Sequence, residues 1–392
     1  MNGLSIYYSK NNITLSKDNI NFNIKNEKKR NPGIDITRIV GMFFIILNHL
    51  LFIGDAFKNY PNYKRQLFSL HILTDWHNNG FILISGIVGY KTNKYSNLFY
   101  LWIMVFFYSF IINLFFKIFK KQFPKQNDIS LEFFPIIFIR YWYFTAYIGM
   151  SLFLPIINKG ISILTKNEFK LVIISTLGLF VFWRDLKNPY LDVFNMKSGN
   201  SMIWFLTYYL LGAYVGKYSV ENKNIKSCVS CFNCILIYLL SSYLYIIIYI
   251  YPFNFGNGFF QNLFKNILRK MLTRRFDSFL KIAQSSASCL FFLQIKYKEK
   301  ITKIICFLGP LVFGIYLIHN HPLVIENILR HIFDKAQKNL KIQSIIIVLL
   351  LKSIKIFVFC IIIDYLRFLL FNYLKIKKIS LFFEKKIYQI FN

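Results

Sequence analysis

The sequence predicts an all-α integral membrane protein, a polytopic helical bundle with about ten transmembrane helices. Hydrophobic residues make up 55% of the 392 residues, and a water-soluble domain of this size would expose too much apolar surface. Apolar runs of about twenty residues recur along the chain, which is the length of a helix that spans a bilayer. The runs are continuous and do not alternate with polar residues, which excludes a transmembrane β-barrel.

The predicted spans follow one another with short, lysine-bearing loops between them. Residues 1–30 are polar and basic and lack the apolar core of a signal peptide. We therefore expect a disordered tail over 1–30, a membrane domain over 31–373 and a basic C-terminal tail over 374–392. A basic segment before the first span and an even number of spans predict that both termini are cytosolic. The spans are expected at about 36–54, 71–90, 98–119, 133–157, 168–184, 200–218, 229–253, 279–295, 303–324 and 343–373.

The charge balance is strongly basic, with 48 Lys and Arg residues against 17 Asp and Glu residues. The basic residues lie between the apolar runs, so we expect them to contact anionic lipid head groups and expect no nucleic-acid partner. Cys228, Cys231 and Cys234 fall on one side of a helix, but no fourth ligand is close in sequence. We therefore predict no metal site.

The first span, "DITRIVGMFFIILNHL", carries two ionisable residues, Arg38 and His49. Eleven positions make about three helical turns, so both residues face the same way, roughly 16 Å apart along the axis. Asp35, one turn before Arg38, is placed to cap the helix or to pair with the arginine. Ionisable groups within spans are costly and are functional candidates. The alternative is an interfacial arginine and a histidine that serves packing.

The small residues of "FILISGIVGY" in the second span predict close contact between helices. The fourth and sixth spans are aromatic, with "RYWYFTAYIGMSLFLPIIN" and "MIWFLTYYLLGAYVG". These rings belong either to the interfacial aromatic belt or to a cleft that stacks on a sugar. The eighth segment, 279–295, is short and serine-rich and is the weakest of the predicted spans.

The end of the ninth span, "GIYLIHNHPLV", holds His319 and His321. Pro322 lacks a backbone donor and restricts His321, so the helix is expected to end or kink there. A broken helix exposes polar backbone groups to a cavity. The alternative is a loop boundary with interfacial histidines.

These stretches, in this order, resemble the integral membrane acyltransferase-3 family, and most closely its branch of surface-polysaccharide O-acetyltransferases. The motifs that carry the resemblance are "GIDITRIVGMFFIILNHL" with its Arg-x10-His pattern, "FILISGIVGYKTNKYSNLFYLWIMVFFYS", "WYFTAYIGMSLFLPIIN", "MIWFLTYYLLGAYVGKY" and "GPLVFGIYLIHNHPLV". The similarity extends over about residues 31–373.

The resemblance implies a membrane O-acyltransferase that uses acyl-CoA, usually acetyl-CoA, as donor substrate and binds no permanent cofactor. The donor enters from the cytosolic side, and the acyl group passes to a carbohydrate hydroxyl at or beyond the other face. Arg38 and His49 match the family's functional pair. Many relatives carry two arginines soon after the Ser-Gly of the second span, whereas this chain has Lys91 and Lys94 there. A lysine offers a point charge in place of a bidentate fork, so these lysines are expected to contact the donor's phosphates more weakly.

The chemistry of acyl transfer suits these residue types. His49 is expected to take the proton of a sugar hydroxyl, or to carry the acyl group itself. Arg38 is expected to bind phosphate oxygens of coenzyme A, and His319 or His321 to orient or replace His49. Two alternatives are a non-enzymatic transporter and a decayed paralogue that has kept the fold but lost catalysis. Transporters usually have broken helices in corresponding halves of the chain, whereas this sequence shows a single broken helix, near Pro322.

Overall fold

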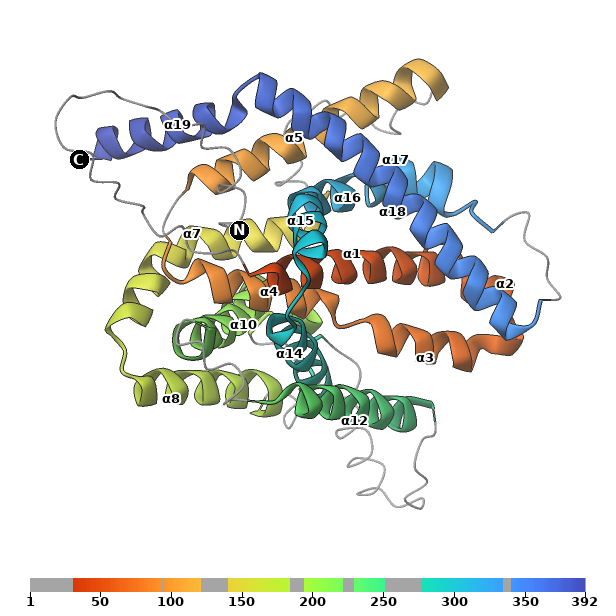
Figure 1. Cartoon of the computed structure of the whole chain (residues 1–392), viewed down its shortest axis with the longest axis horizontal. Helices are drawn as coiled ribbons and strands as arrows, with labels where there is room; N and C mark the ends of the chain where they lie inside the picture. The colour runs from red at the N-terminus through yellow and green to blue at the C-terminus, as the bar shows by residue number, and fades with distance from the viewer. Residues whose placement is uncertain are drawn as a thin grey trace.

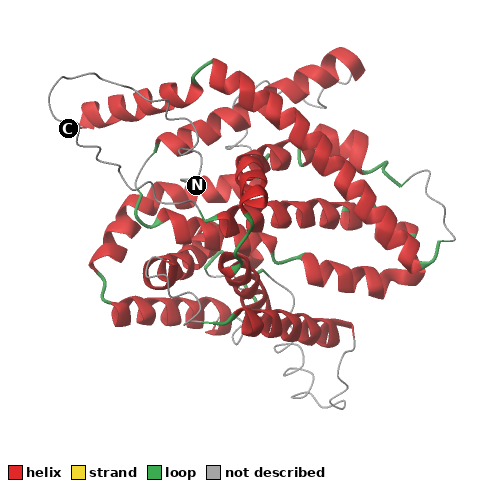
Figure 2. Ribbon diagram, viewed as in Figure 1, coloured by secondary structure: helices red, strands yellow, loops and turns green. Residues whose placement is uncertain are grey.

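The computed structural model describes residues 31–92, 95–120, 140–183, 194–220, 229–250, 276–333 and 340–391. Within these residues the chain is helical and contains no strand (Figures 1 and 2), which confirms the predicted all-α fold. The predicted tail over 1–30, Lys94 and Cys228 lie outside the described residues.

Most of the helices are joined by short connections. Their bounds are α1 (Pro32–Phe52), α2 (Ala56–Asn59), α3 (Lys64–Thr74), α4 (His77–Gly89), α5 (Ser96–Lys120), α7 (Trp142–Ile163), α8 (Lys166–Leu177), α10 (Met202–Val215), α12 (Cys231–Ile250), α14 (Phe279–Gln294), α15 (Glu299–Leu308), α16 (Val312–His319), α17 (Pro322–Val324), α18 (Ile342–Tyr373) and α19 (Ile376–Phe391). π-helical turns continue α8 over Gly178–Trp183 and α10 over Gly216–Val220.

Six helical segments in the described part of the chain are long and apolar enough to cross a membrane. This number confirms the class of polytopic membrane protein. The other predicted spans contain the shorter helices α4, α8, α10 and α14, so the count of ten remains a prediction. The six segments are Pro32–Phe52, Ser96–Phe119, Trp142–Ile163, Cys231–Ile250, Glu299–His319 and Ile342–Tyr373.

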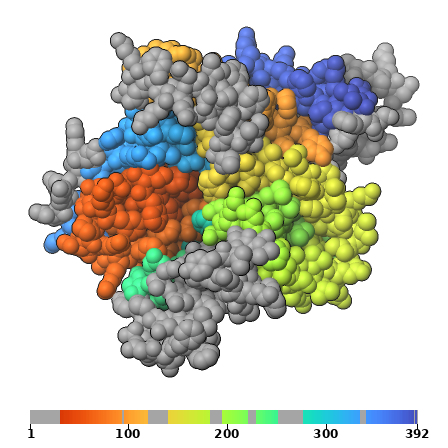
Figure 3. Space-filling model, turned by 180° about the vertical axis from the view of Figure 1, so that it is seen from behind, coloured from red at the N-terminus to blue at the C-terminus, as the bar shows by residue number. Residues whose placement is uncertain are grey.

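Helix α1 forms the centre of the bundle and packs against α4, α14 and α18 (Figure 1). Its start is well defined, because the side chain of Asn31 accepts a hydrogen bond from the Gly33 amide at 2.8 Å and Pro32 takes the first helical position. Asp35 lies in the first turn, where a negative charge interacts favourably with the helix dipole. Seen from behind, the surface of the N-terminal helices, drawn in orange, lies beside the surface of α7, α8 and α10, drawn in yellow to green (Figure 3).

Helices α4 and α10 approach each other closely at glycines. A Cβ atom on Gly86 would collide with the carbonyl oxygen of Tyr209, and one on Gly212 would collide with that of Leu83. Only glycine allows the two backbones this separation, so the close helix contact predicted from "FILISGIVGY" is confirmed.

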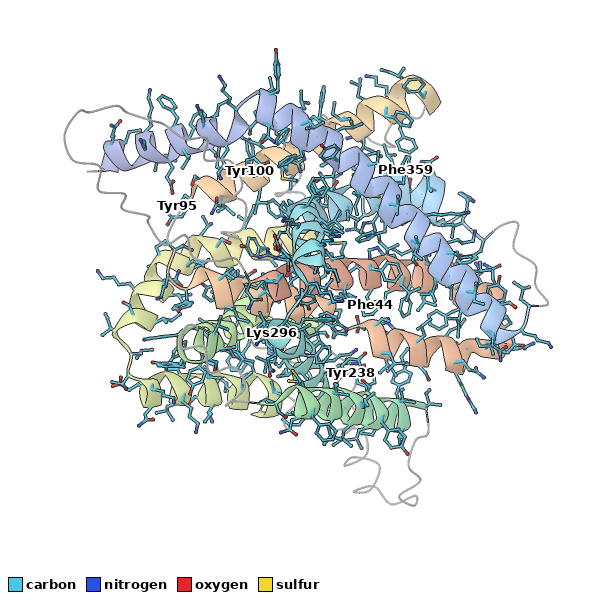
Figure 4. All side chains as sticks on the ribbon, in the orientation of Figure 1. Phe44, Tyr95, Tyr100, Tyr238, Lys296 and Phe359 are labelled. Carbon is cyan, nitrogen blue, oxygen red and sulfur yellow. The ribbon has the colours of Figure 1, made fainter. Side chains whose placement is uncertain are left out.

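A buried ion pair ties α18 to α5. The Arg367 guanidinium contacts both carboxylate oxygens of Asp364, with Nη2 at 2.7 Å from Oδ2. Tyr108 donates to Asp364 at 2.7 Å, and Arg367 donates to the hydroxyl of Tyr100 (labelled in Figure 4) at 3.0 Å. The residues predicted as a basic C-terminal tail contain α19, which packs against α5.

Candidate active site

Arg38 and His49 line one cavity inside the bundle, as their spacing on α1 predicts. This first cavity has a volume of about 130 Å³. Helices α4, α5, α7 and α16 complete its wall, so the site is assembled from elements far apart in the sequence. Its lining is mainly apolar and aromatic and includes Met42, Leu101, Met104, Tyr143, Phe144, Phe313 and Tyr316.

Arg38 is held at one end of this cavity by a carboxylate from the same helix. Its Nη1 atom lies 3.2 Å from Oδ1 of Asp35, which is fully buried. Asn31 caps the helix, so of the two roles expected for Asp35 the structure shows the pairing. An arginine fixed in this way presents a planar set of donors to the cavity at little further cost in side-chain entropy.

His49 lies beside His319 at the other end of the cavity, with 5.1 Å between the ring centroids. Nδ1 of His319 lies 2.6 Å from the Ile315 carbonyl oxygen. A carbonyl oxygen only accepts, so Nδ1 carries a proton, and in the neutral form of the ring the lone pair is on Nε2. Neither that atom nor Nδ1 of His49 has a hydrogen-bond partner in the described structure. Two imidazoles, each with one buried nitrogen that has no hydrogen-bond partner among the described residues, therefore lie side by side, and the ring of His49 lines the cavity.

The predicted break near Pro322 is confirmed. Helix α16 ends at His319 and α17 begins at Pro322. Nδ1 of His321 accepts a hydrogen bond from the Leu323 amide at 3.3 Å, so this histidine caps the short helix. The described residues that line the cavities around His49 do not include His321. The same is true of His319, which reaches the site only through its contact with the His49 ring. The structure thus places Arg38 and His49 on one cavity and His319 behind His49, and it shows no such contact for His321 among the described residues.

Lys91 lies just beyond the end of α4, where its Nζ atom is 5.6 Å from the ring centroid of Tyr90. It is exposed and lines neither of the cavities around His49 in the described part of the chain. Lys94 lies outside the described residues. Contact between these lysines and the donor remains a prediction.

A second cavity of about 720 Å³ begins on the far side of His49 from Arg38. Four residues line both cavities: His49, His77, Asn78 and Trp142. The second cavity is more polar and carries an aromatic wall, in which the ring of Phe68 stacks on that of Tyr249 at 4.0 Å. Its other lining residues are Asn48, Phe52, His71, Asp75, Ser198, Asn200, Tyr245 and Phe276.

The span predicted over 71–90 is not one continuous helix, so that prediction is wrong. The segment breaks between α3, which ends at Thr74, and α4, which begins at His77. No Gly or Pro marks this break, and side chains from other helices stabilise it. The bundle therefore contains a second break of this kind, in addition to the break near Pro322 that the sequence predicted.

The break and its partners contain polar residues that were not among the predicted site residues. Asp75 lies in the break, and Lys281 of α14 lies 3.1 Å from its carboxylate. One signal was present: Lys281, Gln284, Ser285 and Ser288 recur at helical spacing within a predicted span. In a membrane helix such a polar stripe indicates a face that packs on other polar groups.

Comparison with known proteins agrees with this architecture. A family model described as an acyltransferase domain matches residues 31–365. No curated protein and no solved structure matches the chain. The matched range contains α1 with Arg38 and His49, the break that carries Asp75, and α16 with His319. The chain therefore belongs to the acyltransferase-3 family of membrane proteins.

Proposed function

We propose that the protein is a membrane O-acyltransferase that moves an acyl group, acetyl in the simplest case, from acyl-CoA to a carbohydrate hydroxyl. The observation that carries this proposal is the position of His49 between two cavities, one of which also contains Arg38. Membership of the acyltransferase family supports group transfer over transport. Two cavities that share His49 in their lining suit a reaction in which donor and acceptor arrive separately.

The first cavity suits the donor. The Arg38 guanidinium provides charge-assisted hydrogen bonds to phosphate oxygens of coenzyme A at the mouth of α1. The apolar side chains between Arg38 and His49, among them Met42 and Met104, accommodate the long, uncharged arm of the coenzyme. The roughly 16 Å between the two residues along the helix then places the thioester near His49.

The reaction needs His49 to take up one proton and then to release it. The hydroxyl oxygen of the acceptor attacks the thioester carbonyl carbon, a new C–O bond forms and the C–S bond breaks. The hydroxyl proton moves to the imidazole and then to the sulfur of the leaving coenzyme A. The ring of His319 packs beside that of His49 and so limits its orientation, and the Nε2 atom of His319 is available to accept the proton from His49. A variant of the same chemistry has His49 carry the acyl group before the hydroxyl attacks.

Transfer of radiolabelled acetyl-CoA in membranes tests the proposal. Membranes that contain the protein should incorporate label into glycan, and mild base should release the label because an O-acyl ester is base-labile. His49→Ala should lower the rate of this incorporation by about 10²–10⁴-fold. His331→Ala is the matched control, since His331 is exposed and lies outside the described lining of both cavities. Equal incorporation with and without the protein would contradict the proposal.

A further inference from the structure

The break between α3 and α4 is closed by side chains from α12 and α14. A helix end leaves carbonyl groups without backbone partners, and these are costly to leave unsatisfied away from water. The Ile72 carbonyl accepts from Gln284 Nε2 at 2.9 Å and from Lys281 Nζ at 3.4 Å. The Leu73 carbonyl accepts from the hydroxyl of Tyr238 on α12 (labelled in Figure 4), and that of Asp75 from Lys281 at 3.2 Å. The fold therefore supports this break with dedicated donors.

The same lysine forms an ion pair with the side chain of Asp75. Lys281 Nζ lies 3.1 Å from Oδ2 of Asp75 and 4.9 Å from the ring centroid of Tyr245. Lys281 is only 2% exposed and Asp75 9% exposed. Buried ion pairs carry a large desolvation penalty and contribute little net stability, and charges inside membrane helices are usually functional. If Lys281 served only to bind carbonyl groups of the break, the carboxylate of Asp75 would not be needed beside it.

Several polar groups around Asp75 contact one another, and Nε2 of His71 lies 3.8 Å from Oδ2 of Asp75. Oδ1 of Asn48 lies 2.9 Å from Nδ1 of His71, and Nδ2 of Asn48 lies 3.1 Å from Nε2 of His77. Nδ1 of His77 lies 3.2 Å from the Asn78 side-chain oxygen. Both nitrogens of His77 thus have partners within the protein. Oδ1 of Asp75 is 3.6 Å from Nε2 of His77, which is beyond hydrogen-bond distance.

The cavity that Asp75 faces combines hydrogen-bonding and aromatic groups. Asp75 and Asn200 supply acceptor oxygens, while Trp142 and the stacked pair of Phe68 and Tyr249 supply rings. Aromatic rings pack against the C–H faces of a sugar, and a few well-placed polar groups fix its orientation through its hydroxyls. A neutral or weakly cationic polyol therefore fits this cavity better than an acyl chain or an anion does.

We propose that Asp75 binds the acceptor: its Oδ1 atom accepts hydrogen bonds from hydroxyls of a sugar that packs against Trp142, Phe68 and Tyr249. Lys281 is the positioning residue that holds the carboxylate toward the cavity. This assignment rests on the proposed function and deepens it, because it names the group that selects the acceptor. It places acceptor recognition on the far side of His49 from Arg38.

Binding of an oligosaccharide in the absence of acyl-CoA tests the assignment, because nothing turns over under that condition. The probes are cellopentaose, which is neutral, and the glucosamine pentamer, which is cationic, titrated calorimetrically into the purified full-length protein. We expect the wild type to bind at least one probe and Asp75→Asn to bind it at least tenfold more weakly. Coenzyme A affinity, measured on the same preparations, should be unchanged by Asp75→Asn.

A double variant separates binding from folding. Asp75→Asn leaves Lys281 without a counter-charge, whereas Asp75→Asn with Lys281→Met removes both charges and should recover thermal stability without recovering sugar binding. The matched control is Asp364→Asn with Arg367→Met, a buried pair that lines neither cavity, which should bind the probe as the wild type does.

Four results would overturn the assignment: binding of neither probe by the wild type, undiminished binding by Asp75→Asn, recovered binding in the Asp75 and Lys281 double variant, or an equal loss in the control. A failure of the proposed function looks different. In that case sugar binding would persist and depend on Asp75, while label from acetyl-CoA would never reach a glycan.

Discussion

The imidazole rings of His49 and His319 lie 5.1 Å apart, although one belongs to α1 and the other to the end of α16. The contact exists because α16 breaks at Pro322 and packs against α1. It joins the histidine of the first predicted span to one of the two histidines near Pro322. The contact between the rings is one of packing, because neither His49 Nδ1 nor His319 Nε2 has a hydrogen-bond partner among the described residues.

Loss of the imidazole at position 49 should remove the base without affecting the donor. We expect His49→Ala to lower turnover by about 10²–10⁴-fold, the usual contribution of a general base. Coenzyme A affinity should change little, because the ring contacts the reacting end. Transfer rates measured beside coenzyme A binding on the purified variant check both parts. Full turnover by His49→Ala would show that the histidine serves packing.

Changes at Arg38 should have the opposite pattern. Arg38→Ala removes a charge-assisted contact worth about 1.5–3 kcal/mol, so coenzyme A affinity should fall by about 10–150-fold. Arg38→Lys should recover only part of this, because the ammonium cannot form a bidentate contact. Titration of coenzyme A into each variant gives the affinities. Unchanged affinity in Arg38→Ala would place the phosphates elsewhere.

The two histidines near Pro322 should differ in what they affect. His319→Ala should lower turnover while protein levels stay normal, because the ring contacts His49 and not the donor's phosphates. His321→Ala removes a helix cap and should cost about 0.5–2 kcal/mol of stability. His321→Asn should restore the cap and the melting temperature, since Asn is a favoured capping residue. If His321→Asn is stable but as inactive as His49→Ala, His321 takes part in the reaction.

The close contact of α4 with α10 should make Gly86 sensitive to a single methyl group. Gly86→Ala places a Cβ atom against the α10 backbone and should destabilise the protein by about 1–3 kcal/mol, as overpacking does. Gly160→Ala is the control, because a Cβ atom there meets no atom within 4 Å. Thermal unfolding in detergent measures both. Equal melting temperatures would mean that the two helices separate readily.

Both termini should lie on one side of the membrane. The six segments seen as long, apolar helices and the ten spans expected from the sequence are both even in number, and the basic segment before α1 favours the cytosol. Single cysteines introduced near residues 5 and 390 should therefore show the same accessibility to an impermeant maleimide. Labelling of the two positions from opposite sides would require an odd number of crossings.

Several features were predictable because they depend on local sequence. Apolar run length determines the membrane class, and the helical period determines that Arg38 and His49 share a face. The break at Pro322 follows from the missing backbone donor of proline. In each case the cause lies within a few turns of the residue concerned, so the sequence alone is sufficient.

Other features were decided only by the tertiary structure. The α3–α4 break contains no Gly or Pro and is stable because Lys281, Gln284 and Tyr238 satisfy its carbonyl groups from other helices. The pairing of Asp75 with Lys281 joins residues about two hundred positions apart. A polar group in an apolar helix signals that a partner must exist, because leaving it unsatisfied is costly. Which partner it meets depends on how the helices pack, and that information is spread over the whole bundle.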